Sequence, residues 1–202
     1  MDHIAGLLSL REEKSLHLVS TAGVRHLLGR EFLPVLHKYC RIDYSDFPVR
    51  IAGILATALE LETAKAPKYS SQPSTKGTVV ALKLQSGKRA RTCVYLPALP
   101  SITAELTAWV AGCDCVIVDG TFWSEREMIS LGLSKRTARD MGHVPISGQG
   151  GSLEWLRGLD VPRKIYTHIN NSNPILRPTS RERRTIEKAG IEISHDGMDI
   201  EL

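Results

Sequence analysis

Three residues of the types that bind metals or transfer protons stand where a side chain can reach a cleft. Asp119 directly follows the apolar run over 116–118, and His168 directly follows the predicted strand over 164–167. His143 lies in a Gly-His-Val-Pro loop, whose constrained backbone could present an imidazole. In layered α/β folds, metal ligands and acid/base groups come from separate strand ends. The three side chains together therefore predict a metal site or an acid/base cluster.

Taken singly, Asp119, His143 and His168 could each have a purely structural role. The remaining candidates for chemistry are weaker. Four other histidines are expected to be solvated or to cap elements: His17, His26, His37 and His195. The glycines over 148–151 resemble a phosphate loop but lack the Lys-Ser/Thr pair that would follow, so they predict a helix entry. Ser147 has no G-x-S-x-G context, which argues against a nucleophile elbow.

The four cysteines favour reduced thiols in a cytoplasmic protein. They are Cys40, Cys93, Cys113 and Cys115, and they show no regular disulfide framework. Cys113-Asp-Cys115 has C-x-C spacing, and no second pair follows at the distance of a zinc site. Buried, packed thiols are therefore expected rather than a zinc centre.

The elements that must position these residues alternate between short strands and helices. Strands are predicted over 16–20, 40–44, 51–61, 78–84, 91–96, 115–118 and 164–167, and helices over 22–32, 102–110, after Gly151 and before Gly190. Pro34 is expected to end the first helix, and Thr179 to Glu182 to form a capping box for the last. A β-hairpin closed by Ser86-Gly87 is expected between the strands over 78–84 and 91–96, and a second across Asp196-Gly197 is expected to close the chain. This alternation predicts an α/β fold with helices covering mixed sheets.

Composition narrows the class of protein further. The chain has 202 residues, enough for one domain with a sizeable core. With 26 Lys+Arg against 22 Asp+Glu, its net charge of +4 is too small to indicate a nucleic-acid partner. No window approaches about 18 uncharged apolar residues, so no membrane span is expected. No secretory signal is seen at the start.

Several blocks of the sequence, in consecutive order, resemble the PqqB family, pyrroloquinoline quinone (PQQ) biosynthesis protein B, of the metallo-β-lactamase superfamily. They are DGTFW at 119–123, KRTARDMGHVP at 135–145, SGQGG at 147–151, YTHINNSNPIL at 166–176 and DGMDIEL at 196–202. Two earlier blocks also match, HIAGLLSLR at 3–11 and KAPKY at 65–69. The resemblance therefore covers essentially the whole chain.

The resemblance implies an αββα sandwich with a metal centre between its two sheets. Asp2 and His3 match the end of a superfamily metal motif, and Asp119 and His168 match later metal ligands. His143 matches a loop that touches substrate in related hydrolases, so it is the expected catalytic residue. Here Val-Pro follows that histidine, which argues against a hydrolase.

The activity implied by the resemblance is a step in making the redox cofactor PQQ. That step is iron- and oxygen-dependent hydroxylation of the tyrosine ring in a Glu-Tyr precursor, with iron (Fe²⁺) as the expected metal and zinc as the second candidate. A His/His/Asp set with open positions suits non-haem Fe(II). The alternative is non-catalytic binding of PQQ or its precursor, or their transport toward the periplasm. A metallo-hydrolase is a third, weaker hypothesis.

One departure from the family concerns the start of the chain. PqqB proteins carry an additional N-terminal third, so residues 1–202 are expected to form a single metallo-β-lactamase-like domain that lacks this part. A truncated reading frame or a fragment is expected, with one upstream ligand missing. The chain is therefore expected to bind metal weakly and to be inactive. A homodimer remains open.

Overall fold

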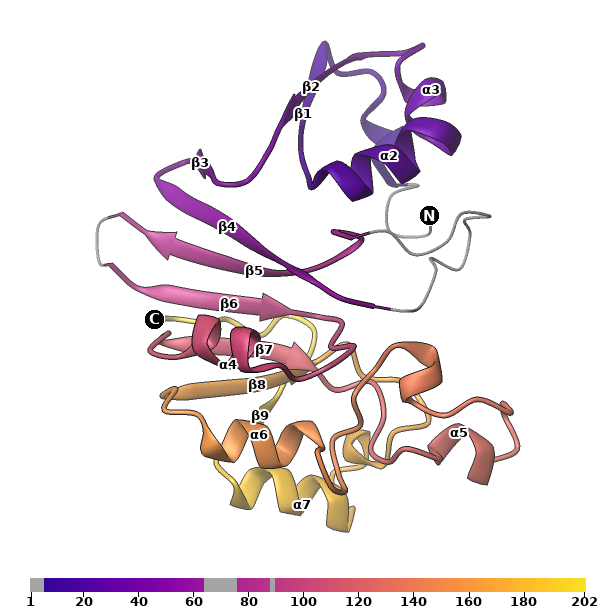
Figure 1. The fold of residues 1–202 in the computed structure, drawn as a ribbon, viewed down its shortest axis with the longest axis vertical. Coiled ribbons are helices and arrows are strands. Elements are labelled where there is room, and N and C mark those ends of the chain that lie inside the picture. The colour runs from indigo at the N-terminus through magenta and orange to yellow at the C-terminus, as the bar shows by residue number, and fades with distance from the viewer. Residues whose placement is uncertain (1–5, 64–75, 88–89) are drawn as a thin grey trace.

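The computed structural model describes residues 6–63, 76–87 and 90–202 (Figure 1). The N-terminal part begins with a short 3-10 helix, η1 (Gly6–Leu10). Two parallel strands follow, β1 (Ser15–Val19) and β2 (Arg41–Ser45), which form a two-stranded sheet of their own. Parallel neighbours need a crossover connection. Helices α2 (Ala22–Glu31) and α3 (Leu33–Leu36) provide it here.

This N-terminal part has a separate small core. Its buried apolar side chains are Leu28, Phe32, Leu33, Leu36, Cys40 and Ile42. Thr21 caps α2, since its hydroxyl accepts a hydrogen bond of 3.3 Å from the amide of Val24. The prediction that the first helix ends before Pro34 is confirmed, with its last residue one position earlier than expected. Helix α2 ends at Glu31, and Pro34 lies in the first turn of α3, where its missing N–H has no helical partner to lose.

The larger part is a seven-stranded sheet with the order β3-β4-β5-β6-β7-β8-β9 (Figure 1). The strands are β3 (Val49–Ile51), β4 (Ile54–Leu61), β5 (Val79–Ser86), β6 (Thr92–Leu96), β7 (Cys115–Asp119), β8 (Arg163–Thr167) and β9 (Glu192–Ile193). Strands β3 to β6 pair antiparallel, which confirms the predicted hairpin of β5 and β6. Strands β6 to β9 pair parallel.

Helices make the crossovers of the parallel half. Helix α4 (Ala104–Val110) lies between β6 and β7, and α7 (Arg181–Lys188) lies between β8 and β9. The longer segment between β7 and β8 carries α5 (Glu127–Ser130), η2 (Arg139–Met141) and α6 (Ser152–Gly158). The short turn η3 (Pro174–Leu176) precedes α7. The predicted interleaving of strands and helices is thus confirmed.

The main core lies on one face of the seven-stranded sheet. Val94, Val116 and Val118 are completely buried there, against side chains of α4, α6 and α7. Side chains alternate along a strand, so Cys93, Tyr95, Cys115, Ile117 and Asp119 point to the opposite face. The candidate site therefore starts from the face of β7 that these helices do not cover.

Two expectations at the C-terminal end differ from the structure. The chain does turn at Asp196-Gly197, where the amide of Met198 donates to the carbonyl of His195, but residues 198–202 form no strand. Instead β9 is two residues long and pairs with β8, and Arg163 holds the tail by donating to the carbonyl of Glu201. Strand β9 thus pairs with β8 and not with residues 198–202.

The helix before Gly190 is capped one residue later than predicted. Ser180, not Thr179, accepts the amide of Arg183 at 3.0 Å, so no Thr179–Glu182 capping box forms. Gly190 does lie just past the helix with φ 70°, as expected of a residue after the C-cap. The prolines and serines over 65–76 predict a surface loop, and this segment lies outside the described residues except for Lys76.

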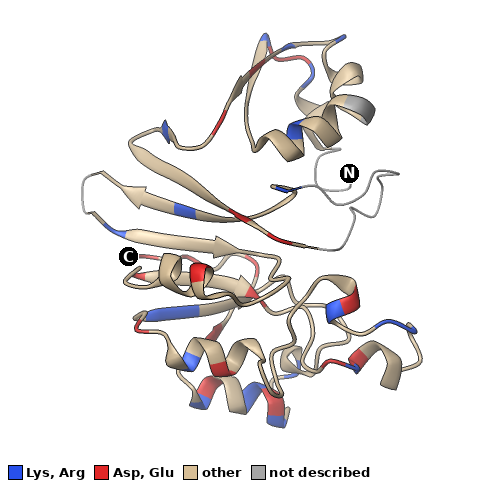
Figure 2. Ribbon diagram, in the orientation of Figure 1, with Lys and Arg blue, Asp and Glu red and all other residues tan. Residues whose placement is uncertain are grey.

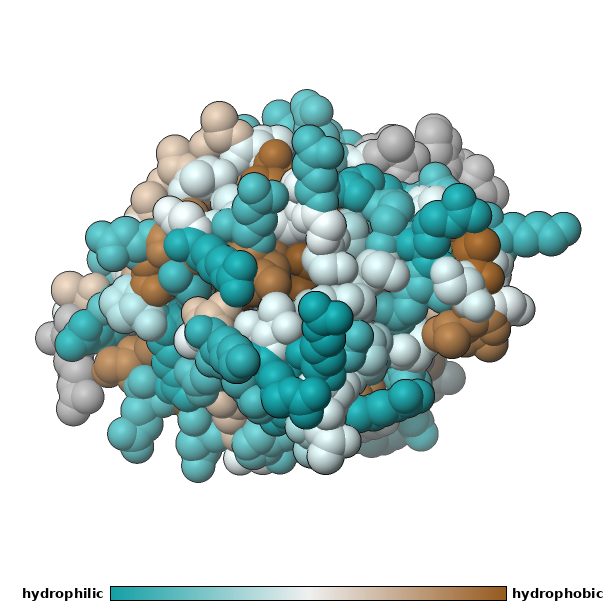
Figure 3. Space-filling model, turned by 90° about the horizontal axis from the view of Figure 1, so that it is seen from below, coloured by the Kyte–Doolittle hydropathy of each residue, from teal (hydrophilic) through white to brown (hydrophobic). Residues whose placement is uncertain are grey.

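The surface of the larger part is mixed in charge. Figure 2 shows basic and acidic residues interspersed along α7, where Arg183 and Glu187 form an ion pair at 2.8 Å. In Figure 3 the face seen from below is largely hydrophilic, with apolar patches separated by polar side chains. Within the described ranges, the structure contains no helix with the length and apolar character that crossing a bilayer requires.

Candidate metal centre

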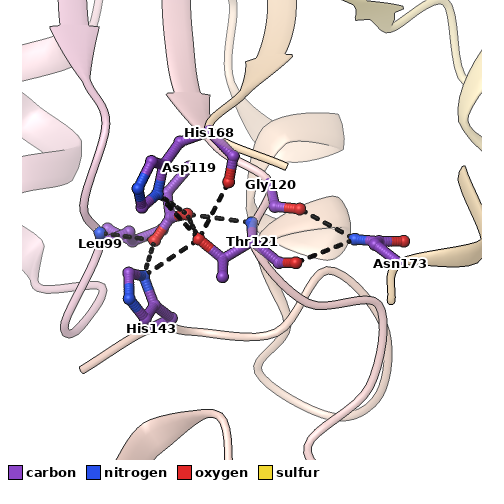
Figure 4. Close-up of polar contacts among 7 residues, drawn as sticks. All are labelled: Leu99, Asp119, Gly120, Thr121, His143, His168 and Asn173. Carbon is purple, nitrogen blue, oxygen red and sulfur yellow. Dashed lines mark hydrogen bonds and ion pairs between the residues drawn. The ribbon is translucent and has the colours of Figure 1, made fainter. Parts of the chain in front are cut away.

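Asp119, His143 and His168 come together at the edge of the sheet where β7 and β8 end (Figure 4). Nδ1 of His143 lies 2.7 Å from Oδ2 of Asp119, and Nδ1 of His168 lies 3.5 Å from Oδ1. One ligand atom of each residue lies within 4.8 Å of those of the other two. The structure therefore juxtaposes the three residues that the sequence singled out.

The close approach of β7 and β8 depends on Gly120. Its amide donates a hydrogen bond of 2.7 Å to the carbonyl of Thr167, so the ends of the two strands are in contact. A Cβ at this position would lie 3.1 Å from Cβ of Tyr166 and 3.2 Å from that carbonyl oxygen. A side chain at 120 would thus push apart the strand ends that carry Asp119 and His168.

The carboxylate of Asp119 is completely buried and held from several sides. Oδ2 accepts the amide of Leu99 at 2.9 Å, and Oδ1 accepts the amide of Thr121 at 3.0 Å. Burial alone raises the pKa of Asp119. The hydrogen bonds of His143 and His168, the charge of His143 and the hydroxyl of Thr121 outweigh it and lower that pKa to about 2. The carboxylate of Asp119 is therefore ionised at neutral pH.

The hydroxyl of Thr121 lies between the three site residues. Oγ1 hydrogen bonds to Oδ1 of Asp119 and lies 2.9 Å from Nδ1 of His168 and 3.2 Å from Nδ1 of His143. It also lies 3.0 Å from the carbonyl oxygen of His168. Since a hydroxyl has one proton and two lone pairs, it can donate to one partner and accept from others. Thr121 thus fixes the carboxylate relative to both rings.

The two histidines differ in exposure and in backbone conformation. The side chain of His143 is 13% exposed, whereas that of His168 is 46% exposed. His168 has φ 54°, in the left-handed region that residues other than glycine seldom adopt. The ring centroids are 5.5 Å apart. The site is therefore open on the side of His168 and closed behind His143.

The asparagine-rich segment after His168 holds the turn that follows Asp119. Asn173 is 2% exposed, and its Nδ2 donates to the carbonyl of Gly120 at 2.8 Å (Figure 4). Its Oδ1 accepts the amide of Ile175 at 3.1 Å. The amide of Asn170 donates to the carbonyl of Thr121 at 3.1 Å. The loop thus ties His168 to Asp119 through backbone groups.

A second buried carboxylate, Glu127 in α5, lies behind this loop. Its Oε2 accepts the amide of Trp123 at 2.6 Å, and its Oε1 accepts the hydroxyl of Ser172 at 2.5 Å. Sequence reasoning gave no role to Glu127, Thr121 or Asn173. The only signal was the run of asparagine and serine after His168, which predicts a polar loop but not its partners.

The other predicted ligands, Asp2 and His3, lie outside the described residues. His143, predicted to be catalytic, lies in direct contact with the carboxylate of Asp119. The four weaker histidines, His17, His26, His37 and His195, are all exposed, as expected. Two imidazoles and one carboxylate form a donor set that suits iron or zinc. The residues present therefore fit a metal ion.

Comparisons with known proteins agree with this fold. A family model described as "Beta-lactamase superfamily domain" matches residues 1–169. Along its whole length the chain is 37% identical to coenzyme PQQ synthesis protein B of Methylobacillus flagellatus and 40% identical to that of Azoarcus sp. (strain BH72), and it spans 70% of each.

Solved structures extend the comparison. The crystal structure of Zn²⁺-bound PqqB from Methylobacterium extorquens aligns with 100% of this chain and with 70% of the PqqB chain. The TM-score is 0.87, and the sequences are 27% identical. A diphosphatase from the PhnP family matches with a TM-score of 0.65 over 98% of this chain and 66% of its own. At 15% identity, the diphosphatase supports the fold alone.

Proposed function

The chain belongs to the family of coenzyme PQQ synthesis protein B, with its metallo-β-lactamase fold, and from this premise we propose that it is an iron-dependent oxygenase. The proposed reaction is hydroxylation of the tyrosine ring in a Glu-Tyr-derived precursor of PQQ. The observation that carries the proposal is the convergence of Asp119, His143 and His168. We also propose that residues 1–202 form a single metallo-β-lactamase-like domain.

The proposed ligands are Asp119 and His168, together with Asp2 and His3. Bound Fe²⁺ would supply the activation of dioxygen at a position left open by the protein. Asp119 is suited to hold a cation because its carboxylate is ionised and aimed by Leu99 and Thr121. His168 is suited to the open side because nearly half of its side chain is exposed.

His143 is the proposed catalytic residue beside the metal. Its Nδ1 donates to Oδ2 of Asp119, which orients the ring and fixes its tautomer. A ring held in this way can move a proton at its other nitrogen when the substrate's phenol or ring carbon loses one. Since His143 is 13% exposed, this proton transfer would take place away from bulk water.

Metal content separates the two roles that His143 could have. A catalytic His143 predicts that His143→Ala keeps bound iron while hydroxylation falls by about 10²–10⁴-fold. A ligand role predicts that the same variant loses iron. His26→Ala is the matched control, because His26 is exposed and outside the triad.

Anaerobic loading with Fe²⁺, followed by oxygen and a Glu-Tyr substrate, tests the proposed reaction directly. We expect a product heavier by one oxygen atom, oxygen consumption that depends on iron, and loss of both in Asp119→Asn. Weak iron binding without turnover would instead agree with the inactive chain expected from the sequence. Binding of PQQ or the precursor without oxygen consumption would instead favour the carrier function. Hydrolysis of a substrate with zinc bound would favour a metallo-hydrolase.

A further inference from the structure

We propose that Cys93 and Cys115 form an oxidisable dithiol, a site at which a peroxide converts two free thiols into a reversible disulfide. The pair lies on β6 and β7, and β7 carries Asp119 at its other end. The site is separate from the candidate metal centre, because three residues of β7 lie between Cys115 and Asp119, which are four steps of about 3.3 Å apart along the strand.

The strand register brings these two cysteines side by side. Cys93 and Cys115 are directly paired in the parallel ladder of β6 and β7. Neighbouring strands lie about 4.8 Å apart, and disulfides join residues whose Cα atoms are about 4.4–6.8 Å apart. The separation of the two Cα atoms therefore lies within the range that a disulfide spans.

Both thiols also point to the same face of the sheet. The residues that follow them, Val94 and Val116, are buried in the core under the helices. Because side chains alternate along a strand, Cys93 and Cys115 share the opposite face. Paired positions on one face are the arrangement in which two side chains make contact.

The two thiols differ in a way that suits stepwise oxidation. Cys93 is partly exposed, whereas Cys115 is completely buried. A hydrogen bond from the thiol of Cys115 and the charge of Arg163 lower the pKa of Cys93, although burial opposes them. The hydrogen bond to Cys93 and burial raise the pKa of Cys115. An accessible thiolate beside a resolving thiol is the pattern of redox-sensitive pairs.

The other two cysteines lack this arrangement. Cys113 lies in the helix-covered core, with its thiol 3.2 Å from the carbonyl of Cys115, and burial raises its pKa to about 11. Cys40 is buried in the N-terminal core, with its thiol 3.9 Å from the carbonyl of Leu36. Cys113 and Cys40 therefore serve as controls for the peroxide reactivity of Cys93 and Cys115.

The reaction balances with one hydrogen peroxide per pair. The thiolate of Cys93 attacks one peroxide oxygen, the O–O bond breaks, and the products are a sulfenic acid and, after proton uptake, water. The sulfur of Cys115 then attacks the sulfenic sulfur, so that an S–S bond forms and hydroxide leaves with the proton of Cys115 as a second water. Two thiols lose two electrons, and the peroxide gains them.

Mass spectrometry of the folded chain tests the proposal. After treatment with hydrogen peroxide, alkylation and digestion without reductant, we expect one linked peptide pair joining Cys93 to Cys115. The free thiols should fall from four to two and return with dithiothreitol. In Cys115→Ser, dimedone should label Cys93 as a sulfenic acid. Cys113→Ser, the matched control, should form the same disulfide as the unmodified chain.

The result on the unmodified chain decides the outcome whether or not the variants fold. Linkage of Cys93 to Cys113, links between chains, or equal peroxide reactivity of all four thiols would overturn the proposal. Oxidation of Cys93 to the sulfinic acid without any linkage would overturn it too, because a resolving thiol in contact should trap the sulfenic acid first.

Discussion

The amide of Gly120 donates a hydrogen bond of 2.7 Å to the carbonyl oxygen of Thr167, and this contact joins the two strand ends that carry the candidate metal ligands. Asp119 precedes Gly120, and His168 follows Thr167. Asp119 and Thr167 are also paired in the β7–β8 ladder. The spacing between the carboxylate and the imidazole therefore depends on how closely the backbone at 120 can approach β8.

Gly120→Ala should damage both the fold and the site. The new Cβ would lie 3.1 Å from Cβ of Tyr166, a completely buried residue that cannot move aside easily. Overpacking of this kind costs about 1–3 kcal/mol. Urea denaturation should show that loss, and titration with Zn²⁺ should show weaker binding.

Gly29→Ala is the matched control for this change. Gly29 lies within α2, and apart from its chain neighbours and the backbone of that helix no atom would come within 4 Å of its added Cβ. Alanine there should be neutral or stabilising by about 0.5–1 kcal/mol, because glycine is the poorer helix former. Equal effects of the two substitutions would contradict the steric argument for Gly120.

Thr121→Val should weaken metal binding with little loss of packing. Valine keeps the shape of threonine but removes the hydroxyl that contacts Asp119 and His168. Loss of such an outer contact costs about 10–100-fold in metal affinity. Competition titrations with Zn²⁺ or Fe²⁺ and a chelator would measure it.

The serine variant at the same position separates the hydroxyl from the methyl group. Thr121→Ser keeps the hydroxyl, so its metal affinity should be within about threefold of that of the unmodified chain. This is a smaller change than the loss of about 10–100-fold expected when the hydroxyl is removed. If serine and valine weaken binding equally, the hydroxyl does not orient the ligands.

Asn173→Ala should loosen the turn after Asp119. It removes the donor to the carbonyl of Gly120 and the acceptor for the amide of Ile175, both in a buried setting. Buried groups left without partners cost about 1–3 kcal/mol each. We expect a lower free energy of unfolding and a metal affinity reduced in parallel.

Asn173→Asp tests the two hydrogen bonds of Asn173 separately. Aspartate keeps an acceptor for Ile175 but places a carboxylate oxygen against the carbonyl of Gly120. It should therefore lower metal affinity, because repulsion between the two oxygens displaces the turn after Asp119, while the hydrogen bond to the amide of Ile175 is retained. A variant that unfolds more readily but binds Zn²⁺ normally would show that Asn173 supports only the fold.

The sequence was informative about the site where local pattern determines position. Asp119 and His168 each follow an apolar strand, and parallel neighbours end at the same edge of a sheet, so their proximity could be predicted. Thr121, Asn173 and Glu127 could not be found in this way. Their roles rest on hydrogen bonds between segments about 50 residues apart, such as Asn173 to Gly120, which no local periodicity encodes.

The same division between local and distant information holds for the fold. The hairpin of β5 and β6 was predictable from its two alternating runs and Ser-Gly turn. A C-terminal hairpin was predicted but does not form, because Ile193 pairs with Tyr166 of β8, which lies far away in the sequence. The end of α2 was predictable from Pro34 to within one residue, but the start of α3 was not, because a proline is compatible with a helix start as well as a helix end.

The carboxylate of Glu127 and the hydroxyl of Ser172 should be energetically coupled, because they bond across the gap between α5 and the loop after His168. Glu127 is 7% exposed and also accepts the amide of Trp123, so Glu127→Ala leaves a buried N–H without its partner. We expect that variant to lose about 1–3 kcal/mol of unfolding free energy.

A double-mutant cycle with Glu127→Ala and Ser172→Ala measures the coupling itself. Each alanine removes one partner of the hydrogen bond, and the loss of the contact between Glu127 and Trp123 is common to both backgrounds and cancels. The coupling free energy from urea denaturation should be about 0.5–3 kcal/mol, as for residues in direct contact. The same cycle with Thr185→Ala in place of Ser172→Ala is the control, since the Thr185 hydroxyl bonds within α7 to the carbonyl of Arg181. Additive effects in the first cycle would mean that Glu127 acts on Trp123 alone and does not hold the loop that carries His168.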